Sequence, residues 1–170
     1  MFTEREVLQQ IVEDDPRGVR GLLARHGALM HEALERFFGV ADATQLDVLE
    51  RILRTLVADL KADRFDDVVE TFYDWVARST FSTCMALRLE RLGGEHPDPD
   101  LLWEASDRLG EGALPADVRE RLRAHLEGCG TCRELQDLCR DIPVEARHAG
   151  AAFPDDFRGV LEQAVATVQG

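Results

Sequence analysis

Apolar residues in the first half of this chain recur at intervals of three and four positions. The clearest run comprises Leu46, Leu49, Ile52, Leu53, Leu56, Val57 and Leu60. This spacing places the apolar side chains on one face of an α-helix, so it predicts an amphipathic helix from about Thr44 to Ala62. No segment shows the sustained apolar–polar alternation that is typical of a β-strand. The sequence therefore predicts an all-α fold.

Other helices follow from the same periodicity. Upstream, the predicted helices are Glu4–Val12, Arg17–His26 and Leu29–Phe38, with a break near Gly27. Apolar residues from Phe65 to Met85, Val68 and Val69 among them, predict one or two more helices that end at Leu92. Downstream, we expect a helix that begins at Leu101 and is capped by Asp100, then helices at 116–126, 133–140 and 155–168, with a loop at 142–154.

The clearest break in the chain is the run from Gly93 to Asp100, which contains two glycines and two prolines. Such a run interrupts helices and is typical of a boundary between domains. We therefore predict a helical bundle at residues 1–93, a small helical domain at 94–141, and a linker with a C-terminal amphipathic helix at 142–170.

Charge and hydropathy limit where this protein acts. Its net charge is −13, which argues against broad non-specific binding to DNA or to anionic lipid. No stretch approaches the roughly 18–20 uninterrupted apolar residues of a membrane span, and the first residues do not have the pattern of a secretory signal. We expect a cytoplasmic protein with no membrane partner.

A metal-binding motif stands in the second half of the chain. His125, Cys129 and Cys132 have the spacing H-x3-C-x2-C. A separation of four residues brings His125 and Cys129 to the same side of a helix end. In a reducing compartment a Cys-x-x-Cys pair indicates metal or redox chemistry more often than a structural disulfide. The motif therefore predicts a zinc site, with a redox pair or a chance arrangement as the alternatives.

A structural zinc takes four ligands, so a fourth is needed. His96 is the only upstream His or Cys at a suitable distance, 29 residues before His125. Cys139 is the rival, but it lies two helical turns beyond Cys132, about 10 Å along the axis. We therefore predict that His96 completes the site. Cys139 is left as a possible redox thiol that could exchange with a zinc ligand.

The segment 96–140 is too short to be stabilised by apolar burial alone. Small domains of this kind are often stabilised by a bound metal. Four protein ligands leave no open position for water, which argues against a zinc hydrolase. The paired carboxylates of the chain come with no nucleophile and no phosphate-binding loop. We therefore expect a protein that is not an enzyme.

Residues 96–140 resemble the zinc-binding anti-sigma domain. The resemblance rests on three features: the opening His96-Pro-Asp-Pro-Asp-Leu-Leu-Trp103, the pair Leu114-Pro115, and the arginine-rich helix that leads into H-x3-C-x2-C. In that family a Cys or His opens the domain and the motif closes it. The resemblance implies that His96, His125, Cys129 and Cys132 bind structural Zn²⁺. A few extra residues at 107–112 depart from the family pattern.

Residues 7–92 are similar, more loosely, to the core-binding region (region 2) of the extracytoplasmic-function sigma factors. The similarity rests on residues 7–23, 42–46, the aromatic block Phe72–Arg78, and 87–91. It implies a partner in the RNA polymerase core and contact with promoter DNA through Arg78, Arg88 and Arg91. The alternative is that the aromatic block is simply the core face of a helix.

Two functions remain open. In the first, the sigma-like half docks on RNA polymerase and touches promoter DNA while the zinc domain restrains or assists it. In the second, the chain binds another sigma factor or regulatory protein without contacting DNA, and the acidic balance of the chain favours this one. Among the other residues, His26 and His31 are expected at surface or cap positions, and Cys84 as a buried apolar thiol.

Overall fold

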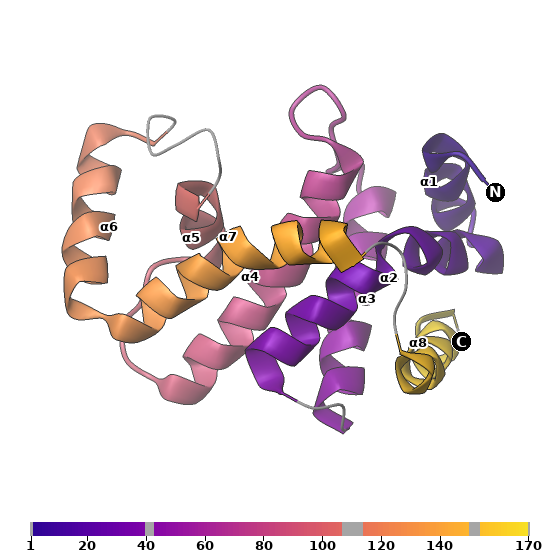
Figure 1. The fold of residues 1–170 in the computed structure, drawn as a ribbon. Helices are drawn as coiled ribbons and strands as arrows, with labels where there is room; N and C mark the ends of the chain where they lie inside the picture. The colour runs from indigo at the N-terminus through magenta and orange to yellow at the C-terminus, as the bar shows by residue number, and fades with distance from the viewer. Residues whose placement is uncertain (1, 40–42, 107–113, 150–153, 170) are drawn as a thin grey trace.

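A computed structural model describes residues 2–39, 43–106, 114–149 and 154–169. Within these ranges the chain forms helices and no strand, which confirms the all-α prediction (Figure 1). The helices are α1 (Glu4–Val12), α2 (Pro16–Phe38), α3 (Ala43–Lys61), α4 (Phe72–Leu92), α5 (Pro99–Ser106), α6 (Ala116–Gly128), α7 (Gly130–Ala149) and α8 (Asp155–Gln169). The extra residues noted at 107–112 lie outside the described residues.

Side chains just before the helices satisfy the first backbone N–H groups. Thr3 and Glu6 form a reciprocal capping box at α1, and Thr71 accepts a hydrogen bond from the N–H of Asp74 at α4. Asp98 accepts from the N–H of Asp100 at 2.8 Å. The cap of α5 is therefore Asp98, and the expectation for Asp100 was wrong by two residues because Pro99 is well suited to the first helical position.

Helix α2 runs without interruption through Gly27, so the predicted break there was wrong. Gly27 is buried, and Ala28, Leu29 and Met30 beside it are buried as well. Burial on several sides of the helix outweighs the roughly 1 kcal/mol that an internal glycine costs relative to alanine.

Helix α7 extends to Ala149, so most of the loop predicted at 142–154 is helical; residues 150–153 of that loop lie outside the described part of the chain. Pro143 stands inside this helix, where it removes one backbone hydrogen bond. Ile142 is fully buried and Ala146 is 6% exposed, so the core-facing stripe continues past the proline. This burial keeps the helix intact beyond Arg140.

The segment 62–71 between α3 and α4 contains turns and no helix, and α4 begins only at Phe72. Phe65 lies outside the helices but packs against the rings of Phe72 and Trp75 at the edge of the core. Val68 and Val69, however, point into solvent, so their assignment to an apolar helical face was wrong.

The core lies between α2, α3 and α4, which all pack against one another. Helix α7 crosses this bundle and contacts α2, α4 and α5, while α8 packs on α3 and α2 (Figure 1). One cluster of buried apolar side chains runs from Val7 in α1 to Val165 in α8. The final helix thus packs back on the bundle. The division at residues 93 and 141 stays a prediction.

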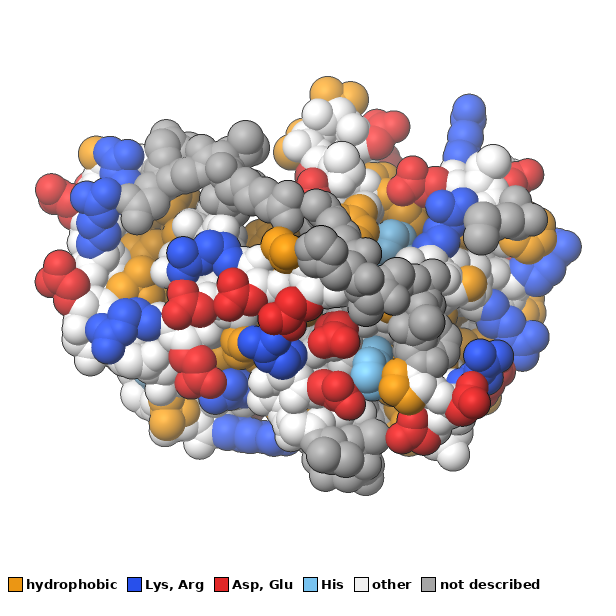
Figure 2. Space-filling model, in the orientation of Figure 1, with side chains coloured by type: hydrophobic (Ala, Val, Ile, Leu, Met, Phe, Trp, Pro, Cys, Tyr) orange, Lys and Arg blue, Asp and Glu red, His pale blue; other side chains and the backbone are white. Residues whose placement is uncertain are grey.

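The face of the molecule seen in Figure 2 carries side chains of both charges. On the face seen in Figure 2, acidic side chains gather along α7, where Glu134, Asp137, Asp141 and Glu145 are exposed. Among the described residues no helix combines the length and apolar character needed to cross a membrane.

His26 and His31 are each only 8% exposed, so the expectation of surface positions was wrong. The His26 ring packs edge-on against Phe72 at a centroid distance of 5.2 Å, and neither ring nitrogen has a hydrogen-bond partner among the described residues. The His31 ring meets Phe157 of α8 at 4.6 Å. Both histidines therefore act as packing residues of α2, and Cys84 is fully buried as expected.

We expect His26 to make the stability of the fold depend on pH. Burial, with a smaller effect of the neighbouring Arg25, lowers the pKa of His26 from 6.5 to about 4. The unfolded chain then binds the proton at a higher pH than the folded chain, so the free energy of unfolding falls as pH drops from 6.5 towards 4. The expected loss is about 3 kcal/mol.

Urea unfolding at pH 7 and pH 4.5 measures this loss, with His26→Phe as the comparison because phenylalanine cannot titrate. The difference between the two proteins isolates His26 from the carboxylates that also titrate. Equal pH dependence in both proteins would contradict the prediction.

Two glycine substitutions are expected to have opposite effects. A Cβ added at Gly18 would lie 2.6 Å from the backbone nitrogen of Ile11, so Gly18→Ala forces α1 and α2 apart and is expected to cost about 1–3 kcal/mol. A Cβ at Gly159 in α8 meets nothing within 4 Å, so Gly159→Ala is expected to stabilise by about 0.5–1 kcal/mol. Urea unfolding of both variants tests this, and shifts of the same sign would refute it.

Candidate metal centre

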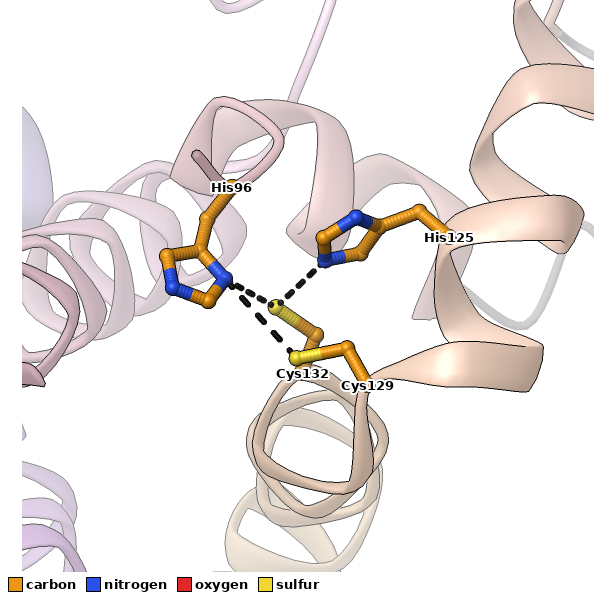
Figure 3. Close-up of side chains that lie close together, drawn as sticks. All are labelled: His96, His125, Cys129 and Cys132. Atoms are coloured by element: carbon orange, nitrogen blue, oxygen red, sulfur yellow. Dashed lines mark hydrogen bonds between the residues drawn. The ribbon is translucent and has the colours of Figure 1, made fainter. Parts of the chain in front are cut away.

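The four predicted ligands come from three separate parts of the chain. His96 lies between α4 and α5, His125 in the last turn of α6, Cys129 at the junction of α6 and α7, and Cys132 in the first turn of α7. Their side chains point toward one another (Figure 3). The fold therefore brings His96 to the motif that lies 29 residues or more further along the chain.

The donor atoms are close enough to share one ion. The Sγ of Cys132 lies 3.3 Å from Nδ1 of His96 and 3.3 Å from Nε2 of His125, and the Sγ of Cys129 lies 3.8 Å from Nδ1 of His96. One ligand atom from each of the four residues lies within 4.8 Å of all the others. Typical zinc–sulfur and zinc–nitrogen bonds place the corners of a tetrahedron about 3.3–3.8 Å apart. The arrangement is compatible with zinc.

The orientation of His96 is set by a backbone contact. Its Nε2 lies 2.9 Å from the carbonyl oxygen of Gly93, and a proton on Nε2 makes this a hydrogen bond. The proton-free Nδ1 then faces the two sulfurs. Gly93 ends α4 with a φ of +75°, a conformation that favours glycine. A backbone carbonyl is one of the common partners of the second ring nitrogen of a metal-binding histidine.

The two thiols have opposite tendencies to ionise. A hydrogen bond from the backbone N–H of Cys132 lowers the pKa of Cys129, which sits at the start of α7. Burial, followed by the hydrogen bond with Cys129, raises the pKa of Cys132 to about 12. Two thiolates this close repel each other, so both ionise together only with a cation between them. This chemistry of the pair fits a bound divalent metal.

Arg133 holds the end of α6 beside the site. Its Nη1 donates to the carbonyl oxygens of Leu126 at 2.6 Å and Glu127 at 2.8 Å, which are among the last carbonyls of α6. This supporting role and that of Gly93 were missed in the sequence. The signal was available for Arg133, since a cation is common just after a helix end.

A comparison with protein families agrees with this part of the chain. The model of a family described as "Putative zinc-finger" matches residues 109–133. The match spans the H-x3-C-x2-C motif of His125, Cys129 and Cys132, and His96 lies upstream of it. No curated protein and no solved structure matches the chain. The family match and the geometry together support a metal-binding, zinc-finger type of site.

Cys139 is not part of the cluster. It is 3% exposed, and its Sγ lies 3.5 Å from the Sδ of Met85. Burial raises the pKa of Cys139 to about 12. A redox-sensing thiol is typically accessible and ionises easily, so this placement does not favour the predicted redox role.

The three arginines predicted as possible DNA contacts make contacts within the chain. Arg78 pairs with Glu70 at 2.7 Å, Arg88 pairs with Glu134 at 3.6 Å, and Arg91 lies over the ring of Phe38 at 5.6 Å. The aromatic block Phe72–Arg78 also faces inward, and Phe72, Trp75 and Val76 are all buried. A promoter contact through these residues stays a prediction.

Proposed function

We propose that this protein is a regulator in a sigma/anti-sigma system that binds a sigma factor through its helical surfaces, and that one structural zinc ion stabilises its second half. The observation that carries the proposal is the convergence of His96, His125, Cys129 and Cys132, together with the zinc-finger family match at 109–133. The same residues carry the resemblance to the anti-sigma zinc domain.

The zinc ion has a structural role in this proposal. Four protein side chains fill a tetrahedral shell and leave no position for water or substrate, which is the arrangement of structural sites. The ion would join the end of α4, the end of α6 and the start of α7. It therefore holds together segments that share few other contacts, and we propose no catalysis.

Between the two functions that the sequence leaves open, protein binding without DNA contact has the better support. Arg78, Arg88 and Arg91 are already engaged by other residues of the chain. The net charge of −13 opposes approach to a phosphate backbone. Docking on the polymerase core by the N-terminal helices is the alternative, and it rests on the sigma-like resemblance alone.

The test uses the zinc-loaded full chain and four purified probes: each extracytoplasmic-function sigma factor of the source genome, core RNA polymerase, holoenzyme, and promoter DNA. We expect a stable complex with at least one sigma factor and no mobility shift of DNA. Binding to core polymerase with DNA opening would instead establish the sigma-like alternative. Binding to none of the probes would refute both.

A further inference from the structure

The segment 62–71, called here the 62–71 loop, projects from the bundle at the top of Figure 1. It carries Val68, which is 90% exposed, and Val69, which is 79% exposed. The other exposed large hydrophobic side chains of the described residues are between 39% and 56% exposed. In Figure 2 this projection carries hydrophobic and acidic side chains next to one another.

Contacts at both ends hold the loop in one shape. Phe65 packs against Trp75 with ring centroids 5.1 Å apart. Arg64 pairs with Asp59 at 2.8 Å on one side of the loop, and Glu70 pairs with Arg78 of α4 on the other. The loop that carries Val68 and Val69 is therefore anchored at both of its ends.

The tip itself is a hydrogen-bonded turn built on Asp66. The side-chain carboxylate of Asp66 accepts a hydrogen bond from the N–H of Val68 at 2.9 Å. The backbone carbonyl oxygen of Asp66 accepts one from the N–H of Val69 at 3.1 Å. Such a turn presents two adjacent valines in a fixed geometry, so a partner that binds them loses little conformational entropy of the loop.

The surroundings of the valines are acidic. Asp63, Asp66 and Asp67 are exposed, and none of them forms an ion pair with another described residue. Beside the tip lies a shallow depression lined by Val69 and Trp103 together with Asp66, Asp100 and Glu104. The two arginines in this depression are Arg64 and Arg78, whose charges are already paired with Asp59 and Glu70.

We propose that the 62–71 loop is a docking surface for a positively charged, amphipathic segment of a protein partner. Val68 and Val69 contact the apolar side chains of that segment, and its Lys or Arg side chains face Asp63, Asp66 and Asp67. A second copy of this chain is disfavoured as the occupant, because its net charge of −13 opposes approach to the acidic loop. An anionic membrane or nucleic acid is repelled for the same reason.

The identity of the partner rests on the proposed function, in which it is a sigma factor. The test measures association and dissociation rates of that purified sigma factor with the full-length, zinc-loaded chain. Val68→Thr with Val69→Thr keeps the branched shape and removes the apolar character; Asp63→Asn with Asp67→Asn removes the charge. Val144→Thr and Asp47→Asn, at exposed positions elsewhere, are the matched controls.

We expect the valine pair to weaken binding by about tenfold or more, chiefly through faster dissociation. The aspartate pair is expected to slow association and to reduce its dependence on salt. The controls are expected to bind like the native protein, and all variants to keep its melting temperature. Native-like binding by both loop variants, or an equal loss in the controls, overturns this inference alone. Absence of any sigma-factor binding by the native protein overturns the proposed function and this inference together.

Discussion

Replacement of Cys132 by alanine is expected to abolish stoichiometric zinc binding and to destabilise the protein on the order of 5 kcal/mol. Structural zinc contributes about 10–16 kcal/mol of folding energy in isolated zinc-finger peptides. The expected loss is smaller here because α5 and α7 also pack on the helical bundle. A drop of about 10–20 °C in melting temperature follows for a domain of this size.

Loss of the metal is expected to destabilise α6 more than the other helices. Leu122, at 5% exposed, is the only buried side chain of this helix, and among the described helices α6 packs mainly on α7, with few contacts. His125 at its end and Cys129 just beyond it are two of the proposed ligands. Without the metal, we therefore expect fast amide hydrogen exchange across α6 while α2, α3 and α4 remain protected.

Metal analysis, thermal melting and hydrogen exchange of Cys132→Ala provide the measurements, and chelation of the native protein should reproduce the result. Cys139→Ala is the matched control, since it removes a buried thiol from the same helix that lies outside the cluster. This control should retain one zinc per chain. Native protein that holds no zinc, or that keeps its melting point after chelation, would refute the structural role of the metal.

Trp75→Ala is expected to cost about 3–5 kcal/mol because it leaves a large cavity in the bundle. Trp75 is 1% exposed and stacks against Phe72 with ring centroids 5.7 Å apart. It also contacts Phe65, which anchors the 62–71 loop. At this chain length the loss corresponds to a decrease of roughly 6–20 °C in melting temperature.

Trp103→Ala is the companion variant, because the side chain of Trp103 is only partly buried beside Phe81. It removes the same group from the edge of the core, so the expected cost is clearly smaller. Urea unfolding of both variants distinguishes a cavity effect from a general effect of losing tryptophan. Equal costs at the two positions would contradict the packing described for Trp75.

Helix identity was predictable wherever one continuous apolar face spans a segment. The helix expected at 44–62 is found at 43–61, and the one expected at 155–168 is found at 155–169. The errors occurred at residues with strong local preferences. A break was predicted at Gly27 and a loop at 142–154, a range that contains Pro143, but both residues lie inside helices because the residues around them are buried. Val68 and Val69 have core-like side chains and yet lie in solvent.

The sequence by itself determined the helical class and the spacing of His125, Cys129 and Cys132, because both depend on relations within a few helical turns. Only the tertiary structure decided that His96 reaches these residues, that the Gly93 carbonyl orients it, and that Cys139 is buried beside Met85. The physical reason is distance along the chain. Residues far apart in sequence meet only after the helices have packed into a common core, and the free energy of that packing is shared among many side chains.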